Sequence, residues 1–124
     1  MATLNATIKV TSADITKDNL SLSNLKSYTV NTGGILTKNI TATTEGSAVK
    51  VFESTEHAAG TKIFLHNKNA TRTLKIKLTA ATTHEMTLAP GAWAFFPWKA
   101  AVDITVFASA SGGTILEYGA FAQV

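Results

Sequence analysis

The sequence predicts an all-β fold: an antiparallel β-sandwich or jelly-roll-like barrel of about 8–10 short strands, in a single domain covering residues 1–124. Apolar and polar residues alternate along most of the chain, which is the pattern of half-buried strands. Turn signals recur between these segments at a spacing typical of sandwiches and barrels. A helical alternative exists only for residues 12–24, where the Ser, Asn and Thr content favours a loop or a very short helix.

The clearest alternation occurs in three segments, Leu4–Val10, Leu74–Leu78 and Val102–Val106. Each of them places apolar side chains on one face of a strand and polar side chains on the other. The further strand candidates, in chain order, are Lys26–Val30, Ile35–Thr43, Ala48–Glu53, Lys62–His66, Thr83–Leu88, Trp93–Phe96 and Thr114–Val124.

Two of the turn signals predict β-hairpins. The turn Asn67–Asn69 would pair residues 62–66 with residues 71–78, and the turn Ser111–Gly113 would pair residues 102–108 with residues 114–124. The other turn signals are Asn31–Gly34, Glu45-Gly46, Ala59-Gly60 and Pro90-Gly91.

Residues 1–25 mix polar and apolar positions in a weaker pattern. Two interpretations remain open: an arm that lies on a neighbouring molecule, or a first strand followed by a surface loop. The first residues lack the basic and apolar segments of a signal peptide, and no apolar run is long enough to span a bilayer. We therefore expect a soluble protein made inside a cell, with no membrane partner.

The chain is poor in charge. Charged residues make up 15% of the sequence, against roughly 25% in ordinary globular domains. Such a surface is easily desolvated when another protein covers it. The net charge is +3, but the lysines are spread along the chain, so we do not expect nucleic acid as a partner. The chain contains no cysteine, which excludes disulfides and thiolate metal sites.

No motif predicts catalysis, so we expect no enzymatic activity, cofactor or metal. The histidines show no metal-ligand spacing, the serines lack a nucleophile elbow, and the glutamates near residue 55 are neighbours in a loop. Lys75 and Lys77 beside Phe64 and Phe95 would form a single-strand nucleic-acid platform, but an ordinary outer sheet face is the favoured interpretation. The candidates considered are His57, His66, His84, Ser109, Ser111, Glu53 and Glu56.

The segment 88–98, LAPGAWAFFPW, contains both prolines and both tryptophans of the chain. Pro90 and Gly91 predict a tight turn, because Pro90 fixes its own φ and Gly91 tolerates a positive φ. The aromatic strand that follows ends near Pro97, which favours an edge or a strand terminus. Its candidate interface or packing residues are Trp93, Phe95, Phe96, Pro97 and Trp98. One aromatic pair must belong to the core; the other either covers the end of the fold or contacts a partner.

Residues 60–124 resemble small structural proteins of tailed bacteriophage virions, particularly those of marine and cyanobacterial podoviruses. The resemblance is carried by Lys62–Asn67, Leu74–Leu78, Met86–Trp93 and the strand that ends in Phe96-Pro97. In that family a Leu-x-Pro-Gly-Glu turn precedes an aromatic residue and a proline-terminated strand. This chain has Ala92 in place of the glutamate.

The resemblance implies a virion structural protein with a β-sandwich or jelly-roll fold, most of all a head decoration (cement) protein. Such a protein would be assembled in the host cytoplasm and lie on the capsid surface as a homo-oligomer bound to the major capsid protein. A tail or fibre-associated accessory protein is the alternative within virions. A carbohydrate-binding module, with Trp93, Trp98 or Tyr118 stacking on a sugar, is the alternative from another class.

Overall fold

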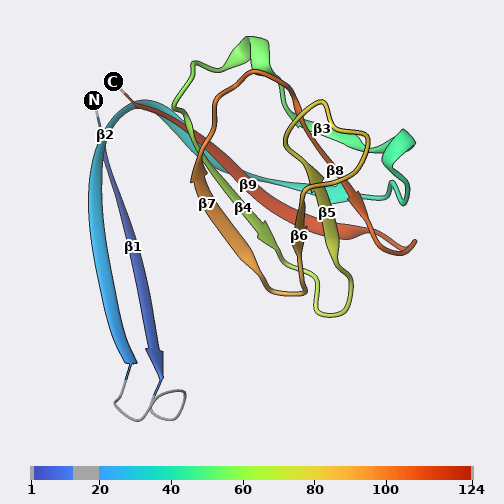
Figure 1. Ribbon diagram of the computed structural model, residues 1–124, viewed down its shortest axis with the longest axis horizontal. Helices are drawn as coiled ribbons and strands as arrows, with labels where there is room; N and C mark the ends of the chain where they lie inside the picture. The colour runs from blue at the N-terminus through green and yellow to red at the C-terminus, as the bar shows by residue number, and fades with distance from the viewer. Residues whose placement is uncertain (1, 13–19, 124) are drawn as a thin grey trace.

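The computed structural model describes residues 2–12 and 20–123, which form two antiparallel sheets packed face to face (Figure 1). The first sheet has the strand order β1-β2-β9-β4-β7 and the second has the order β3-β8-β5-β6. The all-β class and the sandwich are confirmed, whereas the closed jelly-roll-like barrel is wrong, because the two sheets remain separate. The strands are β1 (Ala2–Ser12), β2 (Leu20–Ile40), β3 (Val49–Phe52), β4 (Lys62–Asn67), β5 (Leu74–Lys77), β6 (Met86–Leu88), β7 (Trp93–Pro97), β8 (Ile104–Ala108) and β9 (Thr114–Gln123).

The core lies between the two sheets and follows the predicted alternation. In β4, Ile63 and Leu65 are fully buried and alternate with partly exposed residues. Leu74 and Ile76 on β5 do the same from the opposite sheet. The buried apolar cluster comprises Ile40, Phe52, Ile63, Leu65, Leu74, Ile76, Leu88, Trp98, Ile104, Val106, Ala108 and Leu116.

Both predicted hairpins are wrong. β4 pairs with β7 and β9, and β5 pairs with β6 and β8, so the turn at Asn67–Asn69 carries the chain from one sheet to the other. The turn at Ser111–Gly113 does the same between β8 and β9, with Gly112 and Gly113 both at positive φ. Crossing between the sheets lets the apolar faces of consecutive strands bury against each other, which a hairpin within one sheet does not achieve.

β1 and the first half of β2 form an arm beside the sandwich (Figure 1). Residues 2–12 of β1 pair with residues 20–30 of β2, and residues 30–40 of the same long strand pair with β9. We call β1 and residues 20–30 "the arm". The surface loop of the second interpretation of residues 1–25 is wrong for residues 20–25, which belong to β2, and contact of the arm with a neighbouring molecule stays a prediction. The helical alternative for residues 12–24 lies largely on residues 13–19, outside the described part of the chain.

The arm meets the sandwich at an irregularity in β2. Val30 is in register with Gln123 and Thr32 with Ala122, so β2 contains one extra residue, Asn31, between two neighbouring residues of β9. An extra residue of this kind bends a strand and strengthens its twist. The bend therefore separates the arm half of β2 from the sandwich half.

Candidate interaction surface

The turn at Pro90-Gly91 joins β6 to β7 and is fixed from both ends. The amide of Ala92 donates to the carbonyl of Ala89 at 2.9 Å, and Gly91 has φ 74°, as the second central residue of a type II turn requires. The amide of Gly91 also donates to the carbonyl of Asn67 at 3.0 Å, which ties the turn to the end of β4. The start of the aromatic strand is thereby held in place.

Phe96 and Trp98 point into the sandwich. Trp98 is 5% exposed and its ring lies 6.2 Å from that of Phe52 and 5.7 Å from that of His57, centroid to centroid. Phe96 is partly buried and packs against the core cluster. These two aromatic residues are therefore packing residues.

Trp93 and Phe95 point to the opposite side, away from the core. In the register of the sheet, Trp93 lies beside His66 and Phe95 lies beside Phe64, on the outer face of β4. Trp93 is 53% exposed. Pro97 is exposed at the end of β7, which is the edge strand of the first sheet. Proline has no N–H to donate, and it is tolerated here because no further strand pairs with β7 on its open side.

Phe121 of β9 extends this outer surface. A Cβ atom at Gly33 would overlap the ring of Phe121, and one at Gly119 would lie 3.3 Å from that ring and 2.5 Å from the carbonyl oxygen of Gly34. Because neither glycine has a side chain, the ring of Phe121 packs directly on the backbone at Gly33 and Gly119. This packing offsets the weakening that glycine otherwise causes in a strand. We call Phe64, Trp93, Phe95 and Phe121 the "aromatic face".

The arm presents an apolar surface of its own toward the aromatic face. Leu4 and Ala6 are partly buried while their neighbours Asn5 and Thr7 are exposed, so the Leu4 side of β1 faces the sandwich. Register places Leu22 across from Val10 on that same side. We call this surface the "arm stripe"; it consists of Leu4, Ala6, Ile8, Val10 and Leu22.

A groove of about 400 Å³ separates the arm stripe from the aromatic face. Residues 4–8 line one side, and the four aromatic residues line the other together with Ile35 and His66. The two sides are in contact where the arm leaves the sandwich. There the rings of Tyr28 and Phe95 have centroids 6.3 Å apart, and Nζ of Lys62 lies 5.2 Å from the centre of the Tyr28 ring.

The far half of the arm exposes apolar side chains to solvent. Ile8 is 49% exposed, Val10 47% and Leu22 56%. Isolated apolar residues on a surface are ordinary, but contiguous ones mark a surface that another molecule covers. Together with Trp93 they make the arm stripe and the aromatic face the candidate interaction surface of the protein.

Polar groups lie beside the groove. Nδ1 of His66 lies 3.1 Å from Oε1 of Glu117, and Nζ of Lys68 lies 3.8 Å from Oε2 of the same carboxylate. Charged groups beside an apolar patch are the usual composition of an interface rim.

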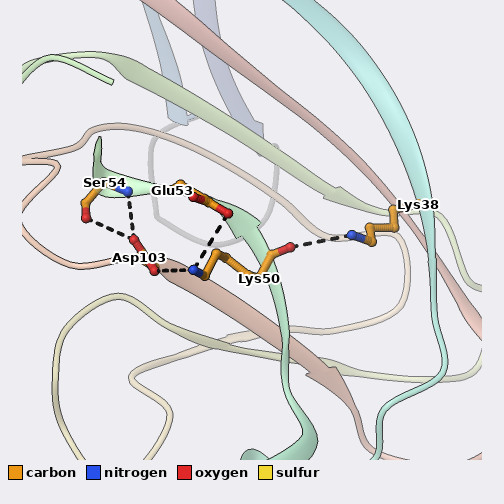
Figure 2. Close-up of polar contacts among 5 residues, drawn as sticks. All are labelled: Lys38, Lys50, Glu53, Ser54 and Asp103. Atoms are coloured by element: carbon orange, nitrogen blue, oxygen red, sulfur yellow. Dashed lines mark hydrogen bonds and ion pairs between the residues drawn. The ribbon is translucent and has the colours of Figure 1, made fainter. Parts of the chain in front are cut away.

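A second polar cluster, shown in Figure 2, lies at the start of β8 (Ile104–Ala108). The carboxylate of Asp103 accepts hydrogen bonds from the amide of Ser54 at 2.8 Å and from its hydroxyl at 2.9 Å, and lies 2.9 Å from Nζ of Lys50. The Lys50 ammonium, followed by the Ser54 donors, lowers the pKa of Asp103 to about 2. Lys50 also lies 3.7 Å from Glu53, and its carbonyl accepts a 3.5 Å bond from Lys38. The cluster ties β3 to the chain entering β8.

The three histidines are separated in the fold. His57 packs on Phe52 and Trp98, and Nδ1 of His84 lies 3.2 Å from Glu45. Within residues 2–12 and 20–123 there is no group of three or more His, Asp or Glu side chains that would hold a metal ion. In the same part of the chain, no helix combines the length and the apolarity needed to cross a membrane.

The alternative that groups Lys75 and Lys77 with Phe64 and Phe95 is wrong, and the favoured outer sheet face describes the two lysines. The two lysines lie on the outer face of β5, in the second sheet, whereas the two phenylalanines lie on the outer face of the first sheet. Nζ of Lys75 instead lies 5.7 Å from the ring of Phe107. The sandwich therefore separates the basic residues from the aromatic ones.

Sequence reasoning found the aromatic strand but missed the residues that complete the surface. Leu4, Ala6, Ile8 and Val10 have the alternation of a core strand, and their place on an arm depends on the pairing of β1 with one half of β2. Phe121 stands in a run of small residues, and nothing local connects it to Trp93. The available signal was the pair of glycines, Gly33 and Gly119, which marks a close approach of a ring to the backbone.

No protein-family model matches this chain, and no curated protein was found that is similar enough to count as a relative. The interaction surface is therefore interpreted from its own geometry.

Proposed function

We propose that the protein is a non-enzymatic structural component of a tailed-bacteriophage virion, of the head decoration (cement) type. It binds the major capsid protein and copies of itself on the capsid surface. The observation that carries this proposal is the arm with its exposed apolar stripe, set beside an aromatic face that includes the exposed Trp93. A monomer in water leaves both surfaces uncovered, and association covers them.

The composition supports binding as the function. Burying apolar area is worth about 25 cal/mol per Å², and a surface with few charges loses little by desolvation. The chain has only 15% charged residues. Among its exposed large apolar residues, four lie on the arm and two line the groove: Ile8, Val10, Leu22 and Leu25, and Ile35 and Trp93. The resemblance of residues 60–124 to virion proteins supports the capsid as the partner of this surface.

Glycan binding is the second candidate, because Trp93 offers an exposed ring for stacking on a sugar. Of the other two residues predicted to stack on a sugar, Trp98 is buried in the core and Tyr118 is partly buried against it. A sugar also needs several hydrogen-bonding groups around the stacked ring, whereas the groove is lined mainly by apolar side chains. Its lining therefore favours a protein partner.

The test is co-sedimentation with expanded, empty capsids assembled from the major capsid protein of the same virus. We expect saturable binding at a fixed number of copies per capsid, weakened by Trp93→Ala. The matched control is Leu25→Ala, because Leu25 is exposed on the other side of the arm. Absence of binding to capsids overturns the decoration role, and binding to isolated tails instead identifies a tail accessory protein. A change in tryptophan fluorescence with soluble glycans identifies a carbohydrate-binding module.

A further inference from the structure

We propose that the arm of one copy packs on the aromatic face of a second copy, so that copies of the chain associate by exchanging arms. This inference rests on the proposed function, because a decoration protein makes contacts between its own copies. The two surfaces that form these contacts are the arm stripe and the aromatic face. The occupant of the aromatic face is the arm stripe of the neighbouring copy.

The first argument is that a single chain carries both halves of the contact. The arm stripe consists of aliphatic side chains on one side of the arm, and the aromatic face consists of four rings from β4, β7 and β9 on the outside of the first sheet. They face each other across the groove, so their chemistry and orientation already match within one molecule. A surface complementary to another surface of the same molecule binds a second copy of that molecule.

The second argument is that the intramolecular contact is incomplete. The arm touches the sandwich near its base, where Tyr28 meets Phe95, but Ile8, Val10 and Leu22 remain about half exposed. β1 has eleven residues and β4 has six. At about 3.3 Å per residue, the arm is roughly 36 Å long and the strand at the centre of the aromatic face roughly 20 Å. The arm is thus longer than the strand at the centre of the aromatic face, so its outer part has no counterpart in its own chain.

The third argument concerns the junction. The extra residue Asn31 precedes Gly33 and Gly34, so the strand that connects the arm to the sandwich combines a bulge with two glycines. Bulges and glycines permit a change of strand direction. The arm can therefore turn from its own sandwich to a neighbouring one while β1 and β2 stay paired. Exchange of an identical element between copies is a low-cost route to an oligomer.

The two contact surfaces are uncharged, and positive charge lies at their edges. The arm stripe and the aromatic face contain no acidic or basic residue. Lys26 lies on the stripe side of the arm, opposite Ala6, and Lys62 lies next to the aromatic face. A lysine placed in the stripe would therefore meet positive charge as well as apolar rings, which makes it a sharp disruptor of this contact.

The experiment measures the oligomeric state of the full chain by light scattering and sedimentation equilibrium. The variants are Ile8→Lys in the stripe and Trp93→Lys in the aromatic face. Leu25→Lys is the matched control, because Leu25 is 66% exposed on the opposite side of the same arm. We expect a closed oligomer for the wild type and the control, and at least a tenfold weaker association for the two test variants. Thermal unfolding checks their fold, and Ile8→Thr replaces Ile8→Lys if the lysine destabilises the strand.

Mixing the two test variants separates arm exchange from any other association. The Ile8→Lys copy keeps an intact aromatic face and the Trp93→Lys copy keeps an intact arm, so a mixed oligomer retains half of its contacts. We expect the mixture to associate more strongly than either variant alone. A monomeric wild type, equal association of Ile8→Lys and Leu25→Lys, or no gain on mixing overturns the inference.

The capsid experiment has a separate readout. Oligomers that exchange arms but do not bind capsids contradict the proposed function and leave the exchange standing. Capsid binding by a wild type that is monomeric in solution contradicts the exchange and leaves the decoration role standing.

Discussion

Asn67 is a polar side chain with no exposed surface, at the end of β4 where the chain leaves the first sheet. Its Nδ2 donates to the carbonyls of Arg72, Leu88 and Ala89 at 2.8–3.1 Å, and its Oδ1 accepts the amide of Asn69 at 3.0 Å. One side chain thus satisfies the carbonyls of two loops. The cross-over after β4 and the turn before the aromatic strand share this residue.

Replacing Asn67 with alanine should lower the free energy of unfolding by about 2–4 kcal/mol, because the carbonyls of Arg72, Leu88 and Ala89 lose this side-chain donor. Urea denaturation followed by circular dichroism measures the change. Asn24→Ala is the control, since Asn24 is exposed on the arm, and it should change stability by less than about 0.5 kcal/mol. Equal effects of the two substitutions would show that the Asn67 network is not a source of stability.

Asp103 should make stability depend on acid pH. Its pKa is lowered from the ordinary 3.8 to about 2, so the folded state favours the charged carboxylate. The stabilisation is therefore complete above about pH 4 and is lost as the pH falls through about 2. We expect the difference in denaturation midpoint between wild type and Asp103→Asn to be constant near neutral pH and to shrink between pH 4 and 2. A difference that stays constant down to pH 2 contradicts the assignment.

At the scale of elements, the long strand β2 decides the organisation of the first sheet. Its second half pairs with β9 in the sandwich and its first half pairs with β1 in the arm. The extra residue Asn31 stands between the two halves and sets which side of the arm faces the aromatic residues. Because side chains alternate with a period of two, a change of one residue there reverses the arm.

Deletion of Asn31 should therefore turn the arm stripe away from the aromatic face and bring Thr7 and Leu25 toward it. The sandwich should keep its fold, since the pairs from Thr32 to Ile40 are unaffected. Nuclear Overhauser contacts between the arm methyl groups and Phe95 measure the orientation. Their loss in the deletion variant, with the core methyl spectrum unchanged, is the expected result; retained contacts would show that the bulge does not set the orientation of the arm.

At the scale of the whole molecule, the protein is a small sandwich whose candidate interaction surface lies outside its core. The core residues account for folding, and Ile8, Val10 and Leu22 of the arm stripe and Trp93 of the aromatic face are among the exposed large apolar residues. The carboxylate of Glu117 beside the groove is already paired with His66 and Lys68, and the other charged groups that flank the two surfaces, Lys26 and Lys62, are both positive. Association through this surface should therefore depend on apolar burial rather than on ion pairs.

This leads to a prediction about salt. Raising NaCl from 50 to 500 mM shortens the screening length severalfold, which weakens contacts between exposed charges but leaves apolar contacts intact. We expect the dissociation constant of the oligomer to change by less than about threefold, whereas ammonium sulfate should strengthen association. Sedimentation equilibrium at each salt concentration measures both effects. A tenfold weakening in NaCl would point to ion pairs as the main contact.

The sequence by itself determined the local properties of this protein. The alternation in residues 62–66 and 74–78 gave the strands and their buried sides, and Pro90-Gly91 gave the turn, because these depend on neighbouring residues alone. It also separated Trp93 and Phe95 from Phe96, since the period of a strand assigns them to opposite faces. The possibility of an arm in residues 1–25 was visible but could not be distinguished from a first strand.

Only the tertiary structure decided which strands pair and which faces are covered. The turns at Asn67–Asn69 and Ser111–Gly113 have the local sequence of hairpin turns. Both nevertheless cross between the sheets, because the apolar faces of the strands that they join bury against each other. For the same reason Phe96 and Trp98 entered the core, while Trp93 and Phe95 met Phe121 on the outer face. Such choices depend on contacts between residues far apart in the chain, and local pattern carries little information about them.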